Sequence, residues 1–348
     1  MFKIEFHDRE MEIEEIMGVL NTQPTLITFI YGPINSGKTE LIQHLIKDLP
    51  ENYKVFYINL RGRFIKGYED FLEVLFEVDE KSKTTEIREY SKAILKNFGK
   101  VLSGIPIPSN LIESLLEKKE KGKDVFKYIE ILLSELSKKF VPVLIVDELQ
   151  VIGDVKIDDL LIYKLFNFFI RLTKEKHVCH IFAITSDALF IERVFSEAML
   201  QGRCRFLKVD DFDRDTVMKF VSKYNFSEEE KEIAWNYCSG KPVCLIELIT
   251  AKLLGKDVDE KAKEMLKVRK GQIEELIYSL EEKDREMFEK AVKILSEFFE
   301  SEIVSYKYLK DEIRFLVGKN ILFANPVDKV LKPQSRLDLL AIREVVKK

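Results

Sequence analysis

The stretch that most constrains the fold is GPINSGKT at residues 32–39, which lies between an apolar run and an amphipathic segment. It fits the pattern G-x-x-x-x-G-K-[ST], in which glycines let successive backbone amides surround a phosphate group at the start of a helix. The pattern requires a strand before it and a helix after it, and TLITFIY and KTELIQHLIKDL supply both. We therefore predict a phosphate-binding loop rather than an ordinary glycine turn. The expected contacts with a nucleotide are Gly32, Pro33, Ile34, Asn35, Ser36, Gly37, Lys38, Thr39 and Glu40.

Five apolar runs of strand length alternate with segments long enough for crossover helices. Nearly every position in these runs is apolar, which is typical of strands buried on both faces of a parallel sheet. We predict an α/β fold of the P-loop NTPase type, with a doubly wound parallel sheet of five strands. The runs are residues 25–31, 54–60, 142–148, 179–185 and 205–211.

The chain divides into three predicted units. Residues 1–212 hold the α/β unit, with a mostly helical insert at about 61–140 that includes SNLIESLLEKK at 109–119. Residues 213–271 show only helical patterns and are expected to form a lid that ends in a charge-rich stretch. Residues 272–348 suggest three helices followed by two short strands, NILFANP and KVLKPQS, which is the order of a winged-helix domain.

The second motif is VLIVDEL at 143–149, an apolar run that ends in two adjacent carboxylates. If this strand ends beside the phosphate loop, Asp147 and the hydroxyl of Thr39 would hold Mg²⁺. Glu148 would then accept a proton from a water that attacks the γ-phosphate, and Lys38 would bridge the β- and γ-phosphates. The plainer alternative is that the two acids only begin a loop. The second carboxylate favours hydrolysis over transfer to a small-molecule acceptor.

Two weaker stretches offer further catalytic residues. FAITSD at 182–187 ends the fourth strand, and Ser186, or else Thr185, is expected to orient the attacking water. The alternative there is a simple helix cap. GRCRF at 202–206 offers Arg203 or Arg205 to the γ-phosphate or to a neighbouring subunit, with a plain surface arginine as the alternative.

Two more stretches could touch the nucleotide outside its phosphates. In CSGKPVCLIEL, Gly240 permits a tight turn, and Pro242 fits the first position of a helix, where its ring could pack on a purine. In HDRE, Arg9 could lie along the adenine or the ribose. The alternatives are a helix start without a ligand for Pro242 and a salt-bridged surface arginine for Arg9.

Charge and hydropathy give no support to several classes of protein. The formal net charge is −4, which gives no reason to expect binding to nucleic acid or to an acidic membrane surface. No run of about 18 uncharged apolar residues occurs, so no membrane-spanning helix is expected. The N-terminal MFKIEFHDRE carries charges where a signal peptide has its apolar segment, and we expect the protein to be cytoplasmic.

Together these stretches resemble the archaeal ATPase family, a STAND-type branch of the P-loop NTPases that is related to the AAA+ class. The likeness lies in FHDRE, YGPINSGKTELI, YINLRGR, VLIVDELQ, FAITSD, the GR before the fifth strand, and SGKP, and it extends over nearly the whole chain. It implies ATP or ADP with Mg²⁺ as ligands, and it places Arg9 and Pro242 in an adenine pocket. Lys241 and Pro242 stand where AAA+ lids more often carry an arginine, which favours a nucleotide-controlled switch over a ring-shaped motor.

The favoured function is an Mg²⁺-dependent ATPase whose lid and winged helix move with the nucleotide state, through an intramolecular contact or a protein partner. The alternative is a DNA-binding initiator or regulator that uses a basic cluster in the winged helix, namely Lys329, Lys332 and Arg336. It is not favoured, because residues 275–348 hold as many acidic as basic residues. A P-loop phosphotransferase is a third alternative, for which we find no acceptor-binding residues.

Overall fold

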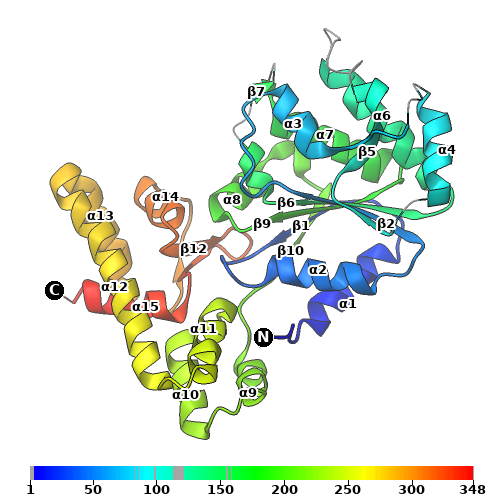
Figure 1. Cartoon of the computed structure of the whole chain (residues 1–348). Helices are drawn as coiled ribbons and strands as arrows, with labels where there is room; N and C mark the ends of the chain where they lie inside the picture. The colour runs from blue at the N-terminus through cyan, green and yellow to red at the C-terminus, as the bar shows by residue number, and fades with distance from the viewer. Residues whose placement is uncertain are drawn as a thin grey trace.

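The computed structural model describes residues 4–347 except 83, 85, 98, 113–120, 154–155 and 158. The α/β unit lies on one side of the molecule, and the helical and C-terminal parts lie on the other (Figure 1). The long helix α12 (Val258–Lys283) leads from the helical part to the C-terminal elements, which approach the α/β unit at α8 (Ala188–Ser196). Among the described residues, no helix combines the length and the apolar content needed to cross a bilayer.

Six parallel strands form the sheet of the α/β unit, in the spatial order β10 (Cys204–Lys208), β1 (Ile27–Tyr31), β9 (His180–Thr185), β6 (Val141–Asp147), β2 (Tyr53–Asn59) and β4 (Val101–Leu102). The five predicted strands are confirmed. All residues of β1 and β9 are buried, as expected for strands with both faces covered. The short strand β4, which comes from the insert, was not predicted.

Helices cover both faces of this sheet (Figure 1). Helices α1 (Glu10–Leu20) and α2 (Lys38–Asp48) pack on one face, where their apolar side chains meet those of β1 and β9. Helices α6 (Lys121–Leu136) and α7 (Leu161–Ile170) pack on the opposite face. Because the strands are parallel, their carboxyl ends lie at the same end of the sheet, between the two helical layers. The site is located at this end.

The insert holds strands as well as helices, and these strands were not predicted. It holds α3 (Tyr68–Leu75), α4 (Ile87–Asn97) and α6, but β3 (Phe76–Asp79) pairs in parallel with β5 (Ile105–Pro108). The sequence of β5 is IPIP, and its prolines suit a two-stranded pair at an edge because proline has no N–H to donate. Of the helix predicted at 109–119, residues 113–119 lie outside the described part of the chain.

The helical part contains α9 (Arg214–Ser222), α10 (Glu228–Cys238), α11 (Pro242–Leu253) and the first half of α12. The charge-rich stretch that was expected to end this part instead continues as α12 for 26 residues. Its charged side chains form the solvent face of a helix whose opposite face is apolar. The buried residues of α12 are Val258, Ala262, Met265, Ile273 and Ile277.

The C-terminal part combines helices with a three-stranded antiparallel sheet in the order β11-β13-β12. Its elements are α13 (Arg285–Ser296), β11 (Val304–Ser305), α14 (Asp311–Gly318), β12 (Leu322–Asn325), β13 (Val330–Pro333) and α15 (Arg336–Val345). The two predicted strands are β12 and β13, whereas β11 and α15 were not predicted. Short elements elsewhere are β7 (Lys156–Ile157), β8 (Asp159–Leu160), 3₁₀ turns at Leu149–Ile152 and Ala198–Leu200, and a π turn at Arg171–Glu175.

Candidate functional site

The predicted phosphate loop joins β1 to α2 through backbone conformations that glycine permits. Gly37 and Asn35 are left-handed, with φ of 90° and 57°. Gly32 has a φ of 155°, and a Cβ at this position would lie 2.1 Å from the carbonyl oxygen of Val209. The loop can therefore approach the end of β10 only with glycine at this position. Because α2 begins at Lys38, its first amides and its positive dipole end face the loop.

Lys38 is buried within its own loop. Its Nζ donates to the carbonyl oxygens of Gly32 at 3.1 Å and Pro33 at 2.7 Å, and to the hydroxyl of Ser36 at 3.3 Å. Burial, followed by the nearby charge of Lys241, lowers the pKa of Lys38 to about 7. The side chain is thus held at the centre of the loop, where an anion would stabilise its charged form.

The carboxylate of Asp147 lies next to the start of α2. The hydroxyl of Thr39 donates to Asp147 Oδ2 at 3.0 Å, and the amide of Glu148 donates to Oδ1 at 2.9 Å. Tyr57, which the sequence did not single out, donates its hydroxyl to Oδ2 at 2.7 Å. Burial and the charge of Asp147 raise the pKa of Tyr57, so the phenol keeps its proton and remains a donor.

Glu148 follows β6 in a left-handed backbone conformation, with a φ of 60°. Both of its carboxylate oxygens have partners. Arg61 donates to Oε1 through Nε at 3.1 Å and also through Nη2, while Gln150 donates to Oε2. Gln150 is held in turn by the hydroxyl of Thr185, which donates to Gln150 Oε1 at 2.8 Å. The sequence did not identify Arg61 or Gln150 as site residues.

A cavity of about 950 Å³ lies over the phosphate loop and brings most of the predicted site residues together. Its lining includes parts of the loop, the end of β6, the first helix turn of α11, and the end of α14 from the C-terminal part. Gly32, Pro33 and Asp147 lie behind this lining. The predicted residues that line the cavity are Arg9, Ile34, Asn35, Ser36, Gly37, Lys38, Thr39, Glu40, Glu148, Ser186 and Pro242.

The end of β9 separates the two residues proposed to orient water. Ser186 lines the cavity, whereas Thr185 is buried behind it and bonds to Gln150. The helix cap that was the alternative for this segment is formed by the next residue, Asp187. Its Oδ1 accepts from the amides of Leu189 at 2.8 Å and Phe190 at 3.0 Å. Ser186 is therefore the residue of this segment whose position agrees with the prediction.

Arg203 does not lie at the phosphate loop, and this corrects the prediction that it meets the γ-phosphate within its own chain. It precedes β10, where its carbonyl accepts from the amide of Ile27 at the start of β1, and its Nη1 donates to the carbonyl of Met199 at 2.9 Å. In a parallel sheet the first residues of all strands lie at the end of the sheet opposite to their last residues. The two ends of a five-residue strand are about 16 Å apart. Arg205 pairs with Thr28 near the same end of the sheet as Arg203 and does not line the cavity either.

Arg9 lines the cavity, but its guanidinium donates hydrogen bonds to other groups of the protein. Its Nη2 donates to the carbonyls of Ser36 at 2.7 Å and Asp210 at 2.8 Å, and its Nη1 pairs with Glu12. The guanidinium also lies 4.5 Å from the centre of the Phe212 ring. Arg9 therefore ties the N-terminal segment to the phosphate loop. The apolar wall beside it, most of which the sequence did not reveal, comprises Phe6, His7, Phe212, Phe220, Pro242, Val243 and Ile246.

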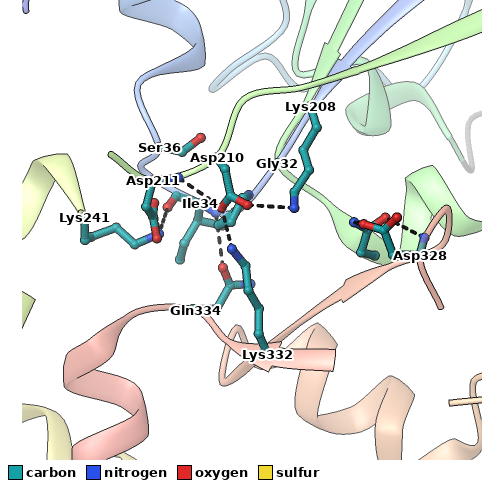
Figure 2. A network of polar contacts seen from close by, with 12 residues as sticks. Gly32, Ile34, Ser36, Lys208, Asp210, Asp211, Lys241, Asp328, Lys332 and Gln334 are labelled. Carbon is teal, nitrogen blue, oxygen red and sulfur yellow. Dashed lines mark hydrogen bonds and ion pairs between the residues drawn. The ribbon is translucent and has the colours of Figure 1, made fainter. Parts of the chain in front are cut away.

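A network of polar contacts fastens the helical and C-terminal parts to the phosphate loop (Figure 2). Lys241 Nζ donates to the carbonyl of Ile34 at 3.0 Å and pairs with Asp211 at 2.8 Å. From the C-terminal part, Gln334 Oε1 accepts from the amide of Ile34 at 3.2 Å. Lys332 pairs with Asp210, which also pairs with Lys208. Three parts of the chain thus converge on the loop and on residues 210–211.

Two family models cover most of the chain. Residues 6–248 match the ATPase domain found predominantly in Archaea. Residues 259–346 match the C-terminal domain of the MJ1010-like uncharacterized ATP-binding proteins. The first match ends within α11, and the second begins at the second residue of α12.

Similar whole chains are known from archaea. A relative from Methanocaldococcus jannaschii, named an uncharacterized ATP-binding protein, is 48% identical over 353 residues that cover 99% of this chain and 98% of the relative. One from Pyrococcus abyssi with the same description is 48% identical over 342 residues that cover 98% of each chain. The solved structure of a Walker-type ATPase of P. abyssi aligns with a TM-score of 0.66 over 97% of this chain and 96% of that chain, at 18% identity. This last likeness shows a shared fold.

Proposed function

From the premise that the chain belongs to the family of ATPase domains found predominantly in Archaea, we propose that it binds ATP over the phosphate loop and hydrolyses it to ADP and phosphate. The observation that carries this proposal is the grouping of Lys38, Thr39, Asp147 and Glu148 around the start of α2. The cavity of about 950 Å³ above them is large enough for a nucleotide. Its apolar wall beside Phe212 is suited to the base.

Thr39 and Asp147 suit Mg²⁺. Both offer oxygen atoms, the ligands that this ion prefers, and Thr39 Oγ1 lies 3.0 Å from Asp147 Oδ2. When bound, the ion would neutralise charge on the β- and γ-phosphates. Tyr57 and the amide of Glu148 would keep the Asp147 carboxylate oriented through their hydrogen bonds.

The proposed reaction is attack of water on the γ-phosphorus. Glu148 takes a proton from this water as its oxygen bonds to phosphorus, and the bond between the γ-phosphorus and the β–γ bridging oxygen breaks. The protonated Lys38 stabilises the charge that builds on the leaving ADP. Ser186, on the cavity wall, helps to hold the water.

The test is the turnover of ATP by Glu148→Gln. We expect the rate of phosphate release to fall at least about a hundredfold, since general-base catalysis contributes on the order of 10²–10⁴. The variant should still bind ATP, with an affinity within about tenfold of the wild type. Glu51→Gln is a matched control, because Glu51 is exposed and lies outside the cavity. A Glu148→Gln protein that hydrolyses ATP as fast as wild type would refute the assignment of the base.

We further propose that the protein is a nucleotide-controlled switch, with the C-terminal part as a winged helix. The order α13, β11, α14, β12, β13 supports the winged-helix interpretation. Lys241 and Gln334 support the switch, because both contact Ile34 of the phosphate loop from other parts of the chain. A change in phosphate content at the loop would alter these contacts and the position of both parts.

The same contacts argue against DNA binding. Of the basic cluster in the C-terminal part, Lys332 is paired with Asp210 and Arg336 with Glu302. Lys329 lies 5.3 Å from the centre of the Tyr306 ring. These charges serve contacts within the chain, which favours intramolecular regulation or a protein partner over a nucleic acid.

A further inference from the structure

The proposed base does not stand free in this structure. Arg61 holds Glu148 Oε1 with two nitrogens, and Gln150 holds Oε2. A carboxylate whose two oxygens already accept charge-assisted hydrogen bonds is a poor acceptor for the proton of a water. Glu148 must therefore lose a partner before it can act.

Arg61 is the partner that can leave. The amide of Leu60 donates to the carbonyl of Asp147 at 3.0 Å, and the amide of Arg61 donates to Asn59 Oδ1 at 2.8 Å, so the backbone is fixed at the ends of β2 and β6. The side chain itself is 68% exposed, whereas that of Glu148 is only 13% exposed. The guanidinium can swing about a fixed backbone with little loss of buried contact.

The other cations of the cavity wall are committed elsewhere. Lys38 is surrounded by carbonyl oxygens of its own loop, and Arg9 is 5% exposed and bound to the carbonyls of Ser36 and Asp210. Among the described arginines and lysines that line the cavity, Arg61 is the one whose charged group is bound to a carboxylate and to no other group.

We propose that Arg61 reads the γ-phosphate of ATP and couples its presence to the release of Glu148. This inference rests on the proposed ATPase function. The γ-phosphate offers three oxygens and more negative charge than a carboxylate, and a planar guanidinium binds phosphate with two parallel hydrogen bonds. Arg61 leaves Glu148 for this group, and Glu148 is then free to take the proton of the attacking water. ADP lacks the γ-phosphate and leaves the pair intact.

The test compares the binding of Mg²⁺-ADP with that of the Mg²⁺ complex of the non-hydrolysable β,γ-imido analogue of ATP. In Arg61→Ala we expect the analogue to bind about tenfold to a hundredfold more weakly, while ADP binds within about twofold of wild type. Arg63→Ala is the matched control. Arg63 is exposed on the same segment, does not line the cavity, and should leave both affinities unchanged.

A double-mutant cycle tests the coupling to the base. Glu148→Gln weakens the hold on Arg61, so the analogue should bind about threefold to tenfold more tightly while ADP is unaffected. In Arg61→Ala/Glu148→Gln this gain should vanish. A gain that persists without Arg61 would show that Glu148 merely repels the phosphate, and the coupling would be wrong.

The outcomes separate this proposal from the proposed function. A wild-type protein that binds neither nucleotide would overturn the ATPase function and the role of Arg61 with it. A wild-type protein that binds and hydrolyses ATP, with Arg61→Ala weakening ADP and the analogue equally or not at all, would overturn the role of Arg61 alone.

Discussion

Lys38 shows how the protonation of a single residue enters nucleotide binding. Burial lowers its pKa to about 7 in the free protein, and a bound phosphate restores the charged form. As the pH rises above 7, a growing fraction of the free protein carries a neutral Lys38, which can donate only two of the three hydrogen bonds described above and must take up a proton when nucleotide binds. Affinity is highest below pH 7 and falls as the pH rises.

We expect the affinity for Mg²⁺-ADP to fall by up to about tenfold for each pH unit above 7, because each binding event consumes one proton at Lys38. Calorimetry at pH 8.5 in two buffers of different ionisation enthalpy measures this uptake directly. Close to one proton should be absorbed per ADP bound. An uptake near zero would mean that Lys38 is already charged in the free protein.

The sequence identified the site residues that belong to contiguous motifs, because their roles follow from their neighbours in the chain. The loop from Gly32 to Thr39 is contiguous, and Glu148 directly follows its strand. Tyr57 and Arg61 lie beside Asp147 and Glu148 because β2 pairs with β6 in this register. The sequence of one strand does not show which residues of another strand it will pair with. Arg203 was misplaced for the same reason, because only the parallel pairing of β10 shows that this residue lies at the far end of the sheet.

At the scale of the elements, the turn between α10 and α11 is packed against the segment that follows β10. The amide of Phe212 donates to the carbonyl of Gly240 at 2.9 Å. A Cβ on Gly240 would lie 1.7 Å from the carbonyl oxygen of Phe212. We expect Gly240→Ala to destabilise the protein by roughly 1–3 kcal/mol, the usual cost of overpacking, as measured by urea unfolding.

Gly271 provides the matched control for this substitution. It lies exposed in the middle of α12, and outside the adjacent residues and the nearby backbone of its own helix no atom lies within 4 Å of a Cβ built on it. Gly271→Ala should therefore stabilise the protein by up to about 1 kcal/mol, because alanine is the better helix former. Two variants with equal and small effects would contradict the packing described for Gly240.

Elements were predicted well where apolar patterns are dense and poorly where polar or proline-rich patterns mislead. The strands of the central sheet are apolar at nearly every position, so their existence and type are unambiguous. In α12 the buried residues are few and widely spaced, and the charged majority resembles a linker. In β5 the prolines at 106 and 108 suggest a turn, although an edge pair tolerates them.

At the scale of the whole molecule, the C-terminal part is fastened to the phosphate loop itself. Gln334 and Ile34 are 300 residues apart in the chain, yet the side chain of Gln334 accepts from the amide of Ile34. Lys332, on β13, reaches Asp210 just after β10. The end of the central strand of the C-terminal sheet thus contacts the nucleotide site, and no local sequence pattern could have shown this (Figure 2).

Removing these two contacts, together with the hydrogen bond that Gln334 Nε2 donates to the carbonyl of Leu322 at 3.2 Å, should loosen the C-terminal part without unfolding the α/β unit. In Lys332→Ala/Gln334→Ala, we expect amides of β12 and β13 to exchange hydrogen about tenfold faster, as for the loss of one or two net hydrogen bonds. Asp210 keeps Lys208 as a partner, so β1 and β9 should exchange as in wild type. Lys307→Ala, exposed in the same part, should change nothing. Faster exchange in every strand would instead indicate global destabilisation, and unchanged exchange would mean that the packing of β12 on α8 suffices to hold the two parts together.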